Sequence, residues 1–481
     1  MVIYVVIKLS MIDKKEIEEK AKYFEINPTH VEKDYVFGWV LFGIFTASNL
    51  KDIFFLKGGN ALRKGYFENT RYSNDLDFGI HNDVDPDFLL QELNKVCDFI
   101  QEKNGVVFTK DDNKVKDKFK EGQEPVTGLK VYEAKLYFKD FYGNPDIIKI
   151  KISMDITRFD KVILPIQKVK LIHPYSDSGD LQCEISCMKL EEIVATKLKC
   201  LLQRQHAPDL FDYVYSIKLL GGSLNKEEVV EVLIQKTIFR KNPNNLKDIL
   251  LKTPFDYFRE FWGKSVICSK EFLLDIEDAI TFFLEDLENL FKIYPDNGYR
   301  SSIYFSPDFR VPIMKAGRDQ KVIKIKYRNE KGISEERFVE PYSIKYMRKE
   351  DGTEFEYLYA YKLRGGFSSP SIKIFRADRM VSVENTEETF DPKYQIELCK
   401  SGEKPEKPYF FDPNKPAKSP ARIITRVKRF GGFSSTKYIY ECSYCNKKFT
   451  KSKQDGKLNP HKDKFGNNCY GRHGYYVDTK Y

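Results

Sequence analysis

The segment LKGGNALRKGYFENTRYSNDLDF, residues 56–78, places a glycine pair after a short apolar run and ends on two aspartates set two apart. The apolar run IFFLK, residues 53–57, predicts a buried strand that turns at the glycines. NALRKGYF then predicts a helix, and DLDFGI, residues 75–80, predicts a second strand. Because side chains alternate along a strand, Asp75 and Asp77 project from one face.

This arrangement suits a magnesium-dependent reaction at phosphate. Two convergent carboxylates are the hard oxygen ligands that Mg²⁺ prefers, with triphosphate oxygens and waters completing the shell. Gly58 and Gly59 let the backbone approach phosphate closely, and the helix start behind them favours an anion. Asp155, in the alternating segment IIKIKISMDIT, offers a third carboxylate. A DxD pair alone is common in solvated loops, but the combination predicts two-metal phosphoryl or nucleotidyl transfer.

The chain of 481 residues is long enough for about three domains. Strand and helix patterns mix up to about residue 295, whereas residues 304–398 hold short alternating segments separated by glycine turns. We therefore expect an α+β fold with a mixed-sheet core and a helical C-terminal lobe, a small all-β module and a zinc-binding tail. The expected boundaries are 1–300 for the first domain, 301–400 for the β module, 401–435 for a proline-rich basic linker and 436–481 for the tail.

The charge is unevenly distributed. Residues 401–481 hold 18 Lys and Arg against 7 Asp and Glu, a balance of +11, so the other 400 residues carry +9 − 11 = −2. A basic tail predicts contact with nucleic acid, and a tail charged for solubility is the alternative. The nine scattered cysteines argue against a disulfide framework, and no apolar run approaches the length of a membrane span. We expect a cytoplasmic protein without a membrane partner.

The tail contains a pattern typical of zinc ligands. Cys442 and Cys445 form a CxxC pair, His461 follows after fifteen residues and Cys469 after seven more. His473 is the alternative fourth ligand. A polar segment of this size folds with the help of a structural metal. Basic residues interleaved with aromatic ones indicate a nucleic-acid-binding finger, and a purely structural knuckle is the alternative.

Residues 56–78 resemble the first motif of the AbiEii/AbiGii-type toxin nucleotidyltransferases, which belong to the polymerase-β-like superfamily. VEKDYV, residues 31–36, is similar to the family's segment before that motif, and residues 189–218 resemble its second conserved block. The resemblance implies that the glycine pair cradles phosphate and that the DxD pair holds metal. It also implies nucleotide-binding roles for five later residues, namely Lys197, Arg204, Asp209, Asp212 and Lys218.

Each nucleotide-binding candidate has a plainer alternative. Lys197 and Arg204 lie seven residues apart and can share one helix face toward a triphosphate, but such residues can also simply face solvent. Asp209 and Asp212 can instead cap a helix. Lys57, at the end of the first strand, is a further candidate for contact with the nucleotide, and a solvated lysine is the alternative.

Residues 336–392 are similar to the WYL domain, a small β-barrel-like sensor module. The resemblance rests on VEPY at 339–342, on Tyr357–Leu358 and on Phe375–Arg376 leading to Asp378–Arg379, with Glu356 where the name-giving tryptophan would stand. It implies binding of a nucleotide or nucleic acid by exposed Tyr and Arg side chains, here Tyr342, Tyr357, Arg376 and Arg379. The alternative is that the tyrosines are strand formers that fill a small core.

Three functions compete on this sequence. The resemblance implies a toxin that transfers NMP from an NTP to a tRNA 3′ end or a protein hydroxyl. It would act in toxin–antitoxin or abortive-infection defence against phage, restrained by an antitoxin or triggered by a phage product. A nucleic-acid-binding regulator with a degenerate transferase fold is the second, and an effector that binds nucleotide without turnover is the third. Retention of all three aspartates, 75, 77 and 155, favours the enzyme.

Overall fold

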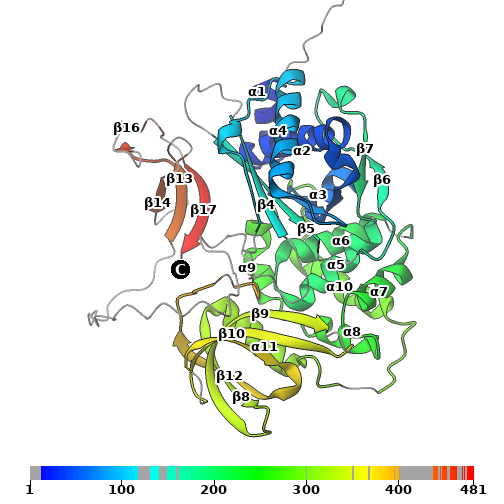
Figure 1. The fold of residues 1–481 in the computed structure, drawn as a ribbon, viewed down its shortest axis with the longest axis vertical. Coiled ribbons are helices and arrows are strands. Elements are labelled where there is room, and N and C mark those ends of the chain that lie inside the picture. The colour runs from blue at the N-terminus through cyan, green and yellow to red at the C-terminus, as the bar shows by residue number, and fades with distance from the viewer. Residues whose placement is uncertain are drawn as a thin grey trace, which may run out of the picture.

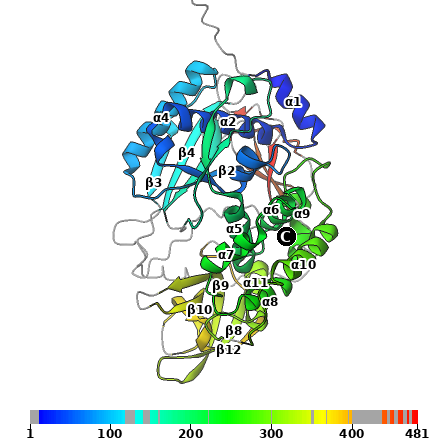
Figure 2. The ribbon, with the colours of Figure 1, turned by 90° about the vertical axis from the view of Figure 1, so that its right-hand side faces the viewer.

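The computed structural model describes residues 12–117, 131–139, 149–158, 162–220, 222–298, 301–348, 352–366, 369–394, 396–399 and most of 437–480. The predicted linker, residues 401–435, lies outside this part of the chain. A mixed sheet with helices α1–α4 is followed by the helices α5–α10 and then by the strands β8–β12, as Figure 1 and Figure 2 show. No helix among the described residues is both long and apolar enough to span a bilayer.

A seven-stranded mixed sheet organises the first part of the fold, in the order β3-β4-β5-β2-β1-β7-β6. Its strands are β1 (Phe55–Lys57), β2 (Asp75–Gly79), β3 (Lys114–Asp117), β4 (Val131–Lys139), β5 (Lys149–Thr157), β6 (Gln167–Lys170) and β7 (Glu184–Cys187). The pairs β2–β5 and β1–β7 are parallel, and the other neighbours are antiparallel. The predicted mixed-sheet core and α+β class are confirmed.

Helices surround this sheet and then form a lobe of their own. Those close to the sheet are α1 (Lys14–Tyr23), α2 (Pro28–Ala47), α3 (Gly58–Ala61), which continues as a π-helical turn over Leu62–Tyr66, and α4 (Pro86–Lys103). The lobe comprises α5 (Leu190–Gln203), α6 (Ala207–Leu220), α7 (Lys226–Gln235), α8 (Pro243–Leu251), α9 (Asp256–Ser265) and α10 (Ile276–Leu290). One continuous apolar core runs through the sheet and this lobe.

The segment VEKDYV lies in α2 and fixes the helix that follows the glycine pair. The buried Asp34 carboxylate accepts from Arg63 at 2.6 Å and pairs with the Lys64 ammonium at 2.9 Å. These two cations hold the pKa of Asp34 well below its usual range, although burial alone would raise it. The ionised Asp34 therefore anchors the residues that follow the Gly58–Gly59 turn.

The β module is a five-stranded antiparallel sheet in the order β11-β10-β9-β8-β12. Its strands are β8 (Lys321–Arg328), β9 (Ser334–Arg348), β10 (Glu354–Arg364), β11 (Ser371–Arg376) and β12 (Met380–Thr389). The predicted antiparallel β module is confirmed, and one helix that the sequence analysis did not predict, α11 (Pro307–Asp319), precedes its sheet. Pro312 and Gly317 interrupt the helical pattern in the sequence, but Ile313 and Met314 pack into the module's core and stabilise the helix.

The tail forms two small sheets. One has the order β14-β13-β17, with bounds Lys448–Lys451, Lys437–Cys442 and Gly474–Lys480. The other pairs β15 (His461–Lys462) with β16 (Asn468–Cys469). His461 stands directly opposite Cys469 in this pair, so a hairpin-like ladder brings two of the predicted zinc ligands together.

Candidate active site and metal centres

The three predicted carboxylates lie on adjacent strands of the mixed sheet. Asp77 of β2 is directly opposite Asp155 of β5 and, on its other side, opposite Lys57 of β1. Residues that face each other across strands project from the same side of a sheet, and Asp75 joins them two residues earlier. The alternating Leu76 and Phe78 point the other way into the core. The sheet therefore gathers the three half-buried carboxylates and one ammonium on one face.

This face is crowded with negative charge. Burial raises the pKa of Asp77 to about 7, and the Asp75 and Asp155 carboxylates add to the rise. The ammonium groups of Lys57 and Lys197 oppose it without cancelling it. A divalent cation would offset the repulsion between these carboxylates, so the electrostatics of the face fit a metal site.

The carboxylates do not form a closed metal cage. In the part of the chain that the structure describes, the only group whose ligand atoms all lie within 4.8 Å of one another is the Cys/His cluster of the tail. An open carboxylate face fits Mg²⁺, which takes one or two carboxylates and keeps waters and substrate phosphates in its shell.

The glycine pair leaves no room for a side chain beside these carboxylates. Gly58 has φ +73°, and a Cβ there would lie 2.4 Å from Oδ2 of Asp77. A Cβ at Gly59 would lie 2.7 Å from Nη2 of Arg71 and 2.9 Å from the Ser73 hydroxyl. The backbone of the turn therefore packs directly between the Asp77 carboxylate and the Arg71 guanidinium, which a side chain at either glycine would push apart.

Lys57 ends the strand before this turn. Its ammonium donates to the Thr157 hydroxyl of β5 at 2.6 Å. The side chain thus lies along the sheet face beside Asp77 rather than extending into solvent. This placement favours the predicted contact with the nucleotide over the solvated alternative.

A buried ion network lies behind the glycine pair. Arg71 binds Asp212 through two nitrogens, each at 2.7 Å, and Lys197 pairs with the same carboxylate at 2.7 Å. Lys197 also reaches Asp209 at 3.1 Å, and Arg204 donates to Asp209 at 2.8 Å. These neighbouring cations hold the pKa of both aspartates below the usual range against the effect of burial.

The contacts of this network exclude the solvent-exposed alternative for Lys197 and the helix-capping alternative for Asp209 and Asp212. Lys197 is buried on α5 instead of facing solvent, and both aspartates lie within α6 with their carboxylates in ion pairs instead of capping it. Arg71 was not predicted, although its place four residues before Asp75 was visible in the motif. A buried arginine requires a carboxylate partner, but the sequence does not say which one.

Lys218 does not join this network. It lies nine residues after Asp209, about 14 Å further along α6 at 1.5 Å per residue. Its ammonium stands 5.2 Å from the ring centre of Phe282 and lines a cavity of about 410 Å³ with Lys226 and Asp286. The structure therefore places Lys218 with the helical lobe, apart from the carboxylate face.

The β module does not present the expected exposed tyrosines. Tyr342 and Tyr357 are only 1% and 5% exposed, and the Tyr342 hydroxyl donates to Glu340 at 2.6 Å. Both tyrosines are therefore buried strand residues that fill the module's interior, which was the alternative to exposed ligand-binding side chains. Arg376 stacks on Phe355 at 3.5 Å and binds Asp378 through two nitrogens, while Arg379 lies 3.7 Å from Glu330.

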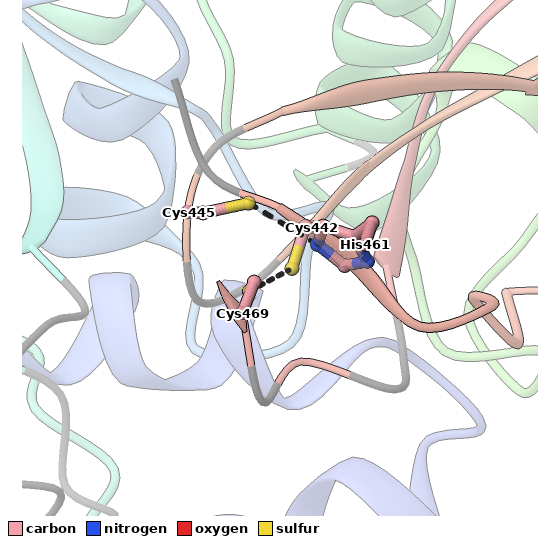
Figure 3. A group of neighbouring side chains, drawn as sticks. All are labelled: Cys442, Cys445, His461 and Cys469. Carbon is pink, nitrogen blue, oxygen red and sulfur yellow. Dashed lines mark hydrogen bonds between the residues drawn. The ribbon is translucent and has the colours of Figure 1, made fainter. Parts of the chain in front are cut away.

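The tail gathers four zinc-type ligands, shown in Figure 3. The sulfurs of Cys442 and Cys469 are 3.7 Å apart, and the Cys445 sulfur lies 3.2 Å from Nε2 of His461. The edge of a tetrahedron with Zn–S bonds of about 2.3 Å measures about 3.8 Å, close to the first distance. Nδ1 of His461 meets the Asn459 carbonyl at 2.9 Å, which leaves Nε2 for a metal. The alternative ligand His473 lies outside the described residues.

Metal binding at the carboxylate face should depend on pH. Because the folded pKa of Asp77 is raised to about 7, a proton competes with the metal below that pH. We expect Mn²⁺ affinity, measured by titration calorimetry on zinc-loaded protein, to rise about fivefold from pH 6 to pH 7 and about twofold more by pH 8. Asp77→Asn should bind weakly and without this slope. An affinity of the wild type that is constant over this range would contradict the assignment.

The tail should hold zinc. Elemental analysis should find about one zinc ion per chain, and Cys442→Ser should lose most of it because a buried thiolate ligand is removed. Trypsin should then cleave the tail at its lysines faster than in the wild type, since metal binding is coupled to folding here. The matched control is Cys183→Ser, a partly buried cysteine outside the cluster. Full zinc content in Cys442→Ser would refute the site.

Comparisons with known proteins identify the family of the chain. Residues 39–325 match the family described as nucleotidyl transferase AbiEii toxin, Type IV TA system, and residues 311–385 match the WYL domain. A solved structure, MenT4, a nucleotidyltransferase toxin from Mycobacterium tuberculosis H37Rv, is similar at 15% identity and a TM-score of 0.41, over 59% of this chain and 91% of its own. No curated protein matches. Since the first match spans more than half of the chain, the chain belongs to the AbiEii family of nucleotidyltransferase toxins and carries a WYL domain.

Proposed function

We propose that the chain is a Mg²⁺-dependent toxin that transfers NMP from an NTP to a tRNA 3′ end or to a protein hydroxyl. It would work in the cytoplasm, in toxin–antitoxin or abortive-infection defence against phage. The observation that carries the proposal is the register that sets Asp77 opposite Asp155, beside the bare glycine turn and the buried cations. Family membership supports the class of reaction and the NTP as substrate.

The residues divide the work by charge. Asp75, Asp77 and Asp155 would hold Mg²⁺, which supplies activation of the acceptor hydroxyl and neutralises charge on the leaving pyrophosphate. The backbone at Gly58 and Gly59 would bind the triphosphate between the Asp77 carboxylate and the Arg71 guanidinium, both of which lie close to the turn. In the transfer, a new bond forms between the acceptor oxygen and the α-phosphorus, and the bond from that phosphorus to pyrophosphate breaks.

Cations of the chain would bind the triphosphate on both sides of the turn. Lys57 lies on the carboxylate face beside Asp77, and Lys197 belongs to the network behind the turn. Arg71 approaches Gly59 closely and would be the guanidinium nearest to a phosphate in that turn. Fixed positive charge of this kind stabilises the charge that develops on a leaving pyrophosphate.

The tail supports a second role, contact with nucleic acid. The segments around the Cys/His cluster carry the exposed lysines Lys447, Lys448, Lys457 and Lys462. Such a unit can hold an RNA backbone and bring a tRNA to the transferase. An antitoxin or a phage product would then act on the same chain as restraint or trigger.

The proposal is tested by incubating purified protein with each labelled NTP, Mg²⁺ and total bacterial RNA, and resolving RNA and protein on one gel. We expect label on tRNA-sized RNA or on protein, and an about thousandfold loss in Asp75→Asn, because a metal ligand is removed without a change of shape. An exposed acid supplies the control, Asp98→Asn, which should label as the wild type does. Absence of label with every NTP would refute the proposal.

Gly58→Ala should abolish transfer through geometry alone. The new Cβ would collide with the Asp77 carboxylate, and the positive φ adds backbone strain of about 1 kcal/mol. Gly105→Ala is the matched control, because Gly105 has φ +93° and open space around it. We expect both variants to lose similar stability in denaturant unfolding and only Gly58→Ala to lose turnover. Equal turnover of the two variants would contradict the role of the turn.

A further inference from the structure

The WYL domain contacts the transferase lobe at the last turn of α5. Arg310 of α11 is 3% exposed and donates through Nη1 to the Leu202 carbonyl at 2.5 Å. Its Nη2 pairs at 2.5 Å with Glu356 of β10, which is fully buried. One guanidinium therefore joins a WYL strand to the end of a transferase helix.

A second contact lies three residues further along the chain. The Gln205 amide donates to the Leu398 carbonyl at 3.0 Å, and Gln205 forms an isolated parallel bridge with Cys399. The Gln205 side chain donates to the Pro254 carbonyl of the helical lobe at 3.2 Å. Residues on the WYL side thus hold both Leu202 and Gln205, which flank Arg204.

Arg204 connects the contacts at Leu202 and Gln205 to the buried ion network of the candidate active site. It follows the end of α5 in an extended conformation, with φ −153° and ψ 153°. Its guanidinium binds Asp209. Lys197 pairs with both Asp209 and Asp212. Asp212 in turn binds Arg71, which lies beside Gly59. A shift of the backbone at Leu202 or Gln205 would therefore move the first member of the buried ion network.

The polar groups at this contact are poorly satisfied for a purely structural interface. Within the described residues, Arg310 Nε, Glu356 Oε1 and the Tyr346 hydroxyl are buried without a hydrogen-bond partner. Buried ion pairs are often no more stabilising than well-packed apolar residues of the same volume. Apolar residues could not donate a hydrogen bond to the Leu202 carbonyl, as Arg310 does. Glu356 holds the Arg310 guanidinium in the orientation that this hydrogen bond needs.

We propose that Arg310 and Glu356 are positioning residues of the transferase, which hold the α5 end so that Arg204 engages Asp209. The WYL domain then completes the nucleotide-binding geometry instead of being an independent module. The proposal rests on the proposed function, because it assigns the ion network to binding of the NTP.

Arg310→Lys tests the proposal in the full-length protein. An ammonium keeps the charge beside Glu356 but lacks the planar fork that also reaches Leu202. We expect a melting temperature close to that of the wild type, an about tenfold fall in kcat/KM for the NTP and faster hydrogen exchange at the Arg204 and Gln205 amides. The matched control is Arg364→Lys, in the exposed pair with Glu388 on the same sheet, which should change none of these.

A second variant covers the case in which Arg310→Lys folds poorly. Arg310→Met with Glu356→Leu removes both charges at similar volume, so the fold should persist while the donor to Leu202 is lost. It should show the same fall in kcat/KM and the same local rise in exchange. Unchanged exchange at Arg204 and Gln205, or wild-type kcat/KM in both variants, would overturn the positioning role alone. A wild-type protein without transfer would overturn the proposed function and the positioning role together.

Discussion

The two-nitrogen bond between Arg71 and Asp212 is the interaction on which the arrangement of the site depends. It joins the segment that carries the first two carboxylates to α6 of the helical lobe, 141 residues away in sequence. Both side chains are buried, so removal of either would leave an uncompensated charge, at a cost of about 3–5 kcal/mol. Together with the apolar core that the sheet and the lobe share, this ion pair of restrictive geometry fixes the carboxylate segment against α6.

The charges around this bond are complementary to a metal-bound triphosphate. Arg71, Lys197 and Arg204 face the carboxylates Asp209 and Asp212, which gives 3 − 2 = +1 behind the glycine turn. Burial lowers the pKa of the adjacent His206 to about 4, so that side chain adds no charge near neutral pH. On the other side of the turn lie the carboxylates 75, 77 and 155. The turn thus separates a face rich in carboxylates from a network of net positive charge.

The sequence predicted individual residues of the site better than the pairs of residues that contact one another. Local rules suffice for Asp75 and Asp77, since period-two alternation puts both on one face, and spacing alone found the four zinc-type ligands. Arg71 escaped because its partner lies far along the chain, and no local pattern encodes which buried carboxylate a guanidinium meets. Whether Tyr342 and Tyr357 are exposed or buried stayed open for a related reason: a tyrosine in a strand alternates like its neighbours, and only packing decides whether its ring is covered.

Glu356 shows how a departure from a family pattern can be informative. A carboxylate in place of a tryptophan weakens the apolar core of the WYL sheet, and it persists here with Arg310 as its buried counter-ion. The pair in turn provides a donor to the transferase helix, and the neighbouring Leu398 and Cys399 provide a backbone partner for Gln205. The WYL domain and the buried ion network therefore meet at residues 202–205, so a shift of the WYL sheet has a direct physical path to the position of Arg204.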